Sequence, residues 1–249
     1  MRNLRNITGV RIVSFSGVDG AGKSTQIERL CECLKERGLR VRHFRFWDDI
    51  ARLKRFREGA GHTIFNGDKG IGSPEAPINR RDKNVGGWLM TCFRYFLYLA
   101  DAISLRIVFQ KALRSNVDVV IFDRYTYDEL ANLNLAQPLT RIYAHIIMHF
   151  IPRPEISFVL DADPVAARAR KPEYPIEFVR MNRRAYVEMN RLFGGFTIIA
   201  PMGVEAAHRE VKMRTLSILM SQQMATDDRC AGSKEPVASE GANAGQAFL

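Results

Sequence analysis

The sequence has no apolar run of about 18 residues, the length that a transmembrane helix needs. We therefore expect no membrane-spanning segment. The N-terminal stretch MRNLRNITGV is too short and too polar for a secretory signal. The four cysteines show neither zinc-site nor disulfide spacing, and this favours a reducing, cytoplasmic compartment. They are Cys31, Cys33, Cys92 and Cys230.

An excess of negative charge is also missing. The chain has 37 Lys and Arg against 27 Asp and Glu, a formal net charge of +10. Such a balance suggests an anionic partner, which is a nucleotide, a nucleic acid or an acidic lipid, and charge alone does not choose among them. With 249 residues and 46% apolar content, the chain is long enough for one large core, and we expect one domain rather than two.

Short β-rich runs alternate along the chain with longer helical stretches. The expected strands are VRIVSFS, RVRHFRF, DVVIF, EISFVLD and FTIIA. Helical periodicity covers residues 23–37, 88–114, 139–150, 175–193 and 204–224. Alternating β and α units predict an α/β fold, a five-stranded parallel doubly wound sheet with helices on both faces.

Two segments depart from this alternation. Residues 58–87 are rich in Gly, Pro, Asn and charge, and a loop of that length is usually functional or disordered. Residues 225–249 lack apolar periodicity and are predicted to be a disordered tail. The expected domain therefore covers residues 1–224.

The stretch FSGVDGAGKS, residues 15–24, fits the phosphate-binding pattern G-x-x-x-x-G-K-[ST]. Its glycines let backbone N–H groups turn toward phosphate oxygens, and the helix that follows adds its positive dipole end. Lys23 is expected to reach the β- and γ-phosphates of ATP, and the Ser24 hydroxyl to ligate Mg²⁺. The alternative is an ordinary Gly-rich turn. The expected nucleotide-binding residues are Gly17, Val18, Asp19, Gly20, Ala21, Gly22, Lys23, Ser24 and Thr25.

The run VVIFDRY places Asp123 at the carboxyl end of a buried strand. In doubly wound sheets ligands bind at that end of the strands, so Asp123 is expected beside the phosphate-binding loop, where it is the second candidate ligand for Mg²⁺. The alternative is a strand-terminal turn with a surface ion pair.

FSGVDGAGKSTQ, followed by DRY roughly a hundred residues later, resembles the thymidylate kinases, a family of P-loop nucleoside monophosphate kinases. The resemblance spans roughly Arg11 to Met220. LDADPVAARARKPE, residues 160–173, is similar to the family's fourth strand and the start of its lid, expected at about residues 168–175.

The resemblance implies a role for each matching residue. Asp19 is the carboxylate near the acceptor sugar, and Arg124 grips the acceptor phosphate. Gly20 stands where some members have an arginine, which implies that basic catalytic residues lie in the lid. Lys171 is one lid candidate, and a solvated basic helix end is the alternative for the lid cations. The expected catalytic residues are Lys23, Asp123, Arg124, Arg168 and Arg170. The expected acceptor-binding residues are Asp19, Arg45, Phe96, Arg124 and Tyr125.

The chain departs from the family pattern in the expected acceptor pocket. Asp48 and Asp49 stand where the family often has a second phosphate-binding arginine, and Arg45 is the candidate substitute. Ala102 stands where the family's long helix has a base-reading arginine. Phe96 on the same helix is a candidate for stacking on the base, with packing into the core as the alternative.

The expected activity is ATP- and Mg²⁺-dependent transfer of the γ-phosphoryl group to a nucleoside monophosphate, dTMP by resemblance. One alternative is a P-loop kinase of another small phosphorylated or hydroxylated acceptor. The other is a non-catalytic regulator that binds nucleotide or nucleic acid. We expect no membrane partner and no nucleic-acid partner, and a homodimer is left open.

Overall fold

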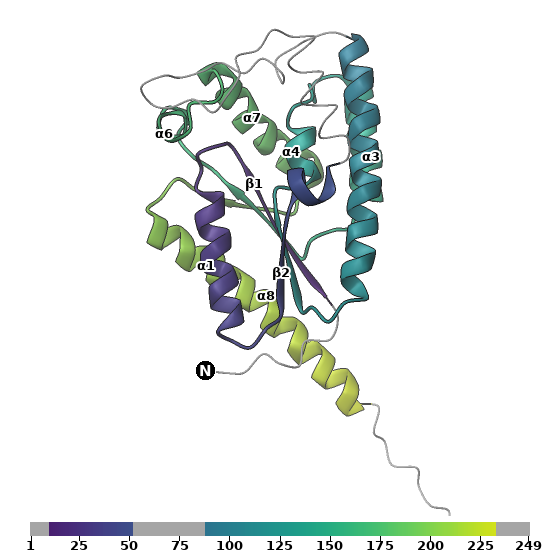
Figure 1. The fold of residues 1–249 in the computed structure, drawn as a ribbon, viewed down its shortest axis with the longest axis vertical. Helices are drawn as coiled ribbons and strands as arrows, with labels where there is room; N and C mark the ends of the chain where they lie inside the picture. The colour runs from purple at the N-terminus through teal and green to yellow at the C-terminus, as the bar shows by residue number, and fades with distance from the viewer. Residues whose placement is uncertain (1–9, 52–87, 233–249) are drawn as a thin grey trace, which may run out of the picture.

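A computed structural model describes residues 10–51 and 88–232, in which strands and helices alternate (Figure 1). The strands are β1 Arg11–Gly17, β2 Val41–Arg45, β3 Val119–Asp123, β4 Ile156–Leu160 and β5 Phe196–Ile199. The helices are α1 Lys23–Lys35, α3 Trp88–Leu113, α4 Thr126–Leu130, α5 Pro138–Phe150, α6 Pro164–Arg170, α7 Ile176–Phe193 and α8 Val204–Gly232. A π-helical turn, η1 Phe46–Ile50, follows β2.

All strand pairs in the sheet are parallel, in the order β2-β3-β1-β4-β5. This confirms the predicted five-stranded parallel sheet. Strand β1 lies in the middle, where Phe15 pairs with Asp123 of β3 and Gly17 pairs with Leu160 of β4. Because parallel strands end at one edge of a sheet, the glycine-rich segment after β1 and the DRY segment after β3 lie side by side.

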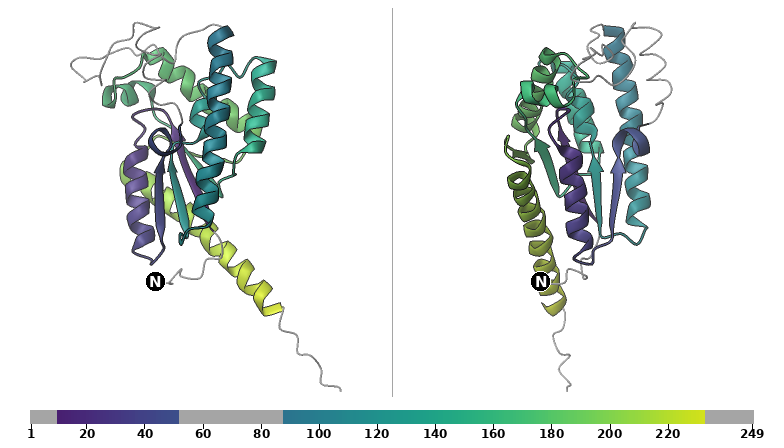
Figure 2. Two further views of the ribbon diagram at one scale, coloured as in Figure 1. Left: turned by 45° about the vertical axis from the view of Figure 1, so that its right-hand side comes forward. Right: turned by 60° about the vertical axis from the view of Figure 1, so that its left-hand side comes forward.

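Helices cover both faces of the sheet, each face with its own apolar core. Alternate residues of β1 point to opposite sides: Ile12 joins a core with α3, α5 and α7, whereas Val13 and Phe15 join a core with α1 and α8. Figure 2 shows α8 and α3 on opposite sides of the sheet. Strand β3 is buried toward both faces and reads as a continuous apolar run for this reason.

The last helix is longer than the sequence suggests. Periodicity ends near residue 224, but α8 continues to Gly232, eight residues into the segment predicted to be a disordered tail. The rest of that tail, residues 233–249, and the whole of the irregular 58–87 loop lie outside the described residues. Within the described ranges, no helix is both long and apolar enough to cross a bilayer.

A buried carboxylate fixes the other edge of the sheet, where β3 begins. Asp118 accepts hydrogen bonds from the backbone N–H of Arg40 at 2.7 Å, from Arg40 Nε at 2.9 Å and from Arg40 Nη2 at 2.5 Å. These hydrogen bonds lower the pKa of the Asp118 carboxyl below its ordinary value of 3.8. The pair ties the turn before β2 to the start of β3.

Replacing Asp118 with Asn should lower the free energy of unfolding at pH 7 by about 1.5–3 kcal/mol, the range for hydrogen bonds to charged groups. The pKa of Asp118 is lowered in the folded state, so its stabilising effect is present above the ordinary carboxyl pKa and is lost as pH falls through the folded value. The difference between wild type and Asp118→Asn, measured by urea denaturation, should therefore shrink below pH 3.8. A difference that stays constant down to pH 2 would refute this assignment.

Candidate active site

The loop after β1 depends on glycine at three positions, for two different reasons. Gly17, Gly20 and Gly22 all have positive φ, at 131°, 82° and 88°. A Cβ on Gly17 would collide with the carbonyl oxygen of Leu160, and one on Gly20 with that of Ala167 in α6. A Cβ on Gly22 would meet no atom within 4 Å, so at Gly22 only the left-handed backbone of the helix N-cap favours glycine.

The Lys23 ammonium is folded back onto this loop. Its Nζ donates to the carbonyl oxygens of Gly17 at 2.8 Å and Val18 at 2.9 Å, and the side chain is buried. Burial, together with the nearby Arg124 cation, lowers the pKa of Lys23 to about 8, against the opposing effect of the Asp19 carboxylate. The loop thus holds a cation whose hydrogen-bond partners are carbonyls that phosphate oxygens can replace.

Oxygen ligands suitable for Mg²⁺ lie at the same edge. Ser24 is exposed in the first turn of α1, beside exposed Thr25, and Asp123 ends β3, which pairs directly with β1. In the described ranges no three His, Cys, Asp or Glu side chains gather as a metal cluster. A hydroxyl and one carboxylate fit Mg²⁺ in a phosphoryl-transfer site, since this ion keeps several waters and takes further ligands from substrate phosphates.

Arg124 turns back from the end of β3 toward the phosphate-binding loop. Its φ of 68° is the one positive value at a non-glycine residue among the described residues, and its N–H donates to the Phe15 carbonyl oxygen at 2.8 Å. The guanidinium forms ion pairs with Asp19 of the loop and with Asp128 of α4, at 3.2 Å to the latter. Burial disfavours its charge, but the two carboxylates outweigh this effect and raise the pKa of Arg124.

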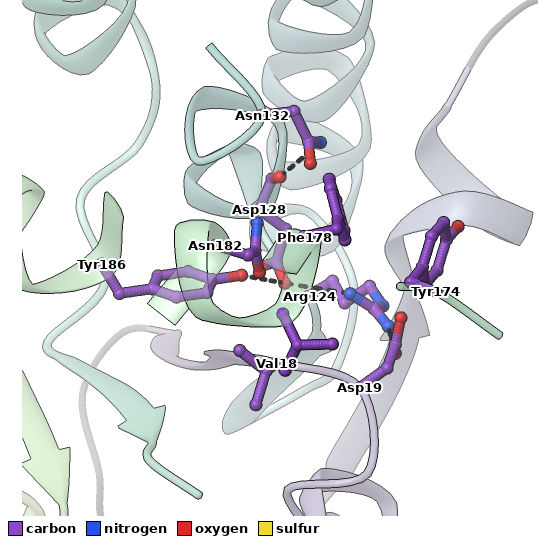
Figure 3. Close-up of a pocket in the computed structure, with 10 residues that line it drawn as sticks. Val18, Asp19, Arg124, Asp128, Asn132, Tyr174, Phe178, Asn182 and Tyr186 are labelled. Carbon is purple, nitrogen blue, oxygen red and sulfur yellow. Dashed lines mark hydrogen bonds and ion pairs between the residues drawn. The ribbon is translucent and has the colours of Figure 1, made fainter. Parts of the chain in front are cut away.

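Asp128 is a residue of this site that the sequence reasoning missed. It is 3% exposed and accepts hydrogen bonds from Arg124 and from the hydroxyl of Tyr186 in α7 (Figure 3). The sequence offers only a weak signal: in DRYTYDEL, Asp128 follows Arg124 by four residues, but Arg124 has a left-handed backbone and lies before α4, so the helix spacing rule does not apply to this pair.

The lid cations differ in what they contact. Lys171, just after α6, has its Nζ 3.6 Å from Asp19 and 3.2 Å from Glu173. Arg170 lines a cavity of about 120 Å³ that also includes Ala21 of the phosphate-binding loop and the segment after β5. Arg168 is half-buried on α6. The loop carboxylate is therefore bridged to Arg124 on one side and to Lys171 on the other.

Three expected acceptor-binding side chains are not brought to Arg124. Tyr125 lies in the core, where its hydroxyl donates to the Pro152 carbonyl oxygen at 2.5 Å. Phe96 is 63% exposed on α3 and does not line the pocket at Arg124. Arg45 has an exposed side chain, and Asp49 accepts a hydrogen bond from its backbone N–H at 2.7 Å, which fixes the start of η1. Ala102 is fully buried.

A pocket of about 10 Å³ remains beside the Arg124 guanidinium (Figure 3). The lining residues are Val18, Asp19, Arg124, Asp128, Asn132, Tyr174, Phe178, Val179, Asn182 and Tyr186. They come from the phosphate-binding loop, the turn after β3, α4 and the turn that follows it, the lid segment and α7. In this conformation the lid segment and α7 close over the arginine.

A five-stranded parallel sheet with a glycine-rich loop at the carboxyl end of its central strand is consistent with the architecture of the P-loop nucleotide kinases. No protein-family profile matches the chain. Individual relatives do. A thymidylate kinase of Solidesulfovibrio magneticus is 30% identical over 171 residues, which cover 64% of this chain and 67% of the relative. A protein named probable thymidylate kinase from Pyrococcus abyssi is 28% identical over 211 residues, covering 80% and 92%.

A thymidylate kinase of Chlorobaculum tepidum is also similar, 30% identical over 169 residues that cover 64% of this chain and 66% of the relative. The chain belongs to the thymidylate kinase family. This confirms the resemblance read from FSGVDGAGKSTQ and DRY.

Gly20→Ala and Gly22→Ala form a matched pair, because the two glycines have nearly the same φ and differ in what their Cβ meets. Gly22→Ala should cost about 1–2 kcal/mol for the left-handed backbone alone. Gly20→Ala should cost about 1–3 kcal/mol more, since the new methyl group collides with the backbone of α6. Urea denaturation measures both changes. Equal losses in the two variants would show that α6 does not rest on Gly20.

Proposed function

We propose that this protein transfers the γ-phosphoryl group of ATP to a nucleoside monophosphate, with dTMP as the acceptor. The observation that supports this most strongly is the placement of two cations at one edge of the sheet: Lys23 is bound to carbonyls of the glycine-rich loop, and Arg124 is paired with Asp19 of the same loop. A lysine in a glycine-rich loop suits the donor phosphates, and a planar guanidinium suits a second phosphate group. The names of the relatives agree with this acceptor.

Phosphoryl transfer requires the protein to position the reactants and to supply positive charge, because negative charge spreads over the transferred group. We infer that Lys23 exchanges the Gly17 and Val18 carbonyls for oxygens of the β- and γ-phosphates. Backbone N–H groups of the loop and the N-terminus of α1 would surround the same oxygens. Ser24 and Asp123 would hold Mg²⁺, which neutralises the phosphates when bound.

Arg124 would receive the acceptor phosphate, and Lys171 would bring positive charge from the lid to the transferred group. Arg170 lines the cavity beside Ala21, a place that suits stacking of its guanidinium on the base of the donor nucleotide. The roles proposed for Arg168 and Arg170 thus differ: Arg168 stays a candidate for the transferring phosphate, whereas Arg170 suits the donor's base.

The test of this proposal is ADP release from ATP and Mg²⁺ with dTMP, dUMP, dCMP, dGMP and dAMP, with thymidine and a DNA oligonucleotide as further acceptors. Phosphorylation of dTMP is expected, and Lys23→Ala should lower kcat by about 10²–10³-fold, the usual effect of removing one preorganised donor. Because buried Ala102 cannot donate a hydrogen bond to a base, the preference for dTMP should stay below about 10³-fold. If none of the nucleotides causes ADP release, the proposed function is refuted. If the preference for dTMP exceeds about 10³-fold, the inference from Ala102 about base recognition is refuted.

The lowered pKa of Lys23 leads to a separate prediction about the pH dependence of nucleotide binding. In the free protein the ammonium loses its proton near pH 8, so the Kd for an ATP analogue should rise above that pH, toward about tenfold per unit. Lys23→Arg keeps its charge and should show a flat profile over pH 7–9.5. Titration calorimetry without acceptor measures how the Kd for the ATP analogue changes with pH in wild type and in Lys23→Arg, and the comparison uses these slopes rather than the Kd values themselves. An equally steep rise in Lys23→Arg would assign the titration to another group.

A further inference from the structure

Asp128 has an unusual environment for a carboxylate on a helix of five residues. The carboxylate is buried and each of its oxygens accepts two hydrogen bonds, of which Figure 3 shows those to Arg124 and Tyr186. Oδ1 accepts from Arg124 Nη1 at 3.2 Å and from the Tyr186 hydroxyl at 2.9 Å. Oδ2 accepts from the Ser16 hydroxyl at 2.6 Å and from the Tyr125 N–H at 3.0 Å. Four donors thus use four acceptor positions.

These donors come from three parts of the fold that meet at the site. Ser16 lies on β1 immediately before Gly17, where the phosphate-binding loop begins. Arg124 and Tyr125 form the turn after β3, and Tyr186 lies on α7, which covers the pocket. A single carboxylate therefore connects the donor-phosphate loop, the acceptor-phosphate arginine and the helix above them.

We propose that Asp128 is a positioning residue for the acceptor phosphate: it holds Nη1 of Arg124 so that Nη2 faces the phosphate-binding loop. The inference rests on the proposed function of Arg124. The side chain of Asp128 is 1% exposed and that of Asp19 is 15% exposed. An arriving phosphate therefore displaces the Asp19 carboxylate from Arg124, while Asp128 stays and keeps the guanidinium aimed.

The hydrogen-bond pattern explains why a carboxylate is needed here. An asparagine of the same shape has one acceptor oxygen and one NH₂ group. Either orientation of that amide turns the NH₂ toward a group that can only donate, the Arg124 guanidinium or the Tyr125 N–H. Asp128→Asn therefore disturbs the site by charge and by hydrogen bonding, with almost no change of volume.

The experiment compares Asp128→Asn with Asp118→Asn, which also removes a buried carboxylate paired with an arginine, but at the opposite edge of the sheet. Asp128→Asn should raise the KM for dTMP by about tenfold or more while the KM for ATP changes by less than about twofold. Asp118→Asn should lower stability and leave both KM values within about twofold. Equal rises in both KM values of Asp128→Asn would indicate a merely structural role and overturn the proposal.

A double-mutant cycle tests whether Asp128 acts through Arg124. In an Arg124→Lys background, Asp128→Asn should change the KM for dTMP by less than about twofold, because the group it positions is already replaced. A full effect in that background would overturn the proposal.

A second variant applies if Asp128→Asn does not fold. Tyr186→Phe removes one donor, keeps the carboxylate, and should raise the KM for dTMP alone by about two- to fivefold. If Tyr186→Phe leaves both KM values unchanged, or raises the KM values for dTMP and ATP equally, the proposal is overturned.

A measurement without turnover separates this inference from the proposed function. The Arg124 Nε–H signal in ¹⁵N–¹H NMR should be sharp and slow to exchange in the wild type and in Asp118→Asn, and lost in Asp128→Asn. If the wild type transfers no phosphate to dTMP, the proposed function fails, and this signal still decides whether Asp128 fixes Arg124. An unchanged Arg124 signal in folded Asp128→Asn would overturn the positioning role.

Discussion

A guanidinium is costly to bury, and much of the architecture of this site follows from burying one. Arg124 is enclosed by the phosphate-binding loop, α4 and α7, and it stays charged because Asp19 and Asp128 lie against it. Its backbone is left-handed, and its guanidinium reaches Asp19 in the loop that follows β1. The loop carboxylate, the position of α4 and the closure of α7 are parts of one arrangement that keeps this cation paired.

The resting site is consequently close to electrical neutrality before any nucleotide binds. Lys171 is paired with Asp19 and Glu173, and Lys23 is held by backbone carbonyls. Phosphate groups entering such a site exchange one set of partners for another, so the net gain is smaller than the attraction between bare charges.

The fold could be predicted from the sequence because its signals are local. The alternation of short apolar runs with helical stretches predicts the parallel sheet, and the glycines followed by a lysine and a serine predict the glycine-rich loop after β1. The side chains around Arg124 are a different case, since the partner of a charge is decided by elements far apart in the chain. Asp128 meets Ser16 across 112 positions and Tyr186 across 58, and no pattern in the sequence specifies these pairs.

Two predicted site residues have local contacts that the sequence did not indicate. Tyr125 follows Arg124 directly and was expected at the ligand, but the turn that brings Arg124 forward sends Tyr125 into the core, to Pro152. Asp49 stands where the family often has an arginine, and its carboxylate accepts a hydrogen bond from the Arg45 N–H at the start of the π-helical turn after β2. In both cases the residue type is compatible with a ligand site, whereas the contact that the side chain makes depends on the path of the backbone.

The middle position of β1 determines how readily this strand takes part in local unfolding. Among the described strands, β2 and β5 each have one neighbour in the sheet, whereas β1 is hydrogen-bonded along both sides and lies between two cores. Local unfolding begins where few contacts must be broken, so the sheet frays from its outer strands inward. Amide hydrogens of β1 are then exchanged only in rare, nearly global openings. The glycine-rich loop after β1 is thus anchored in the slowest-opening part of the sheet.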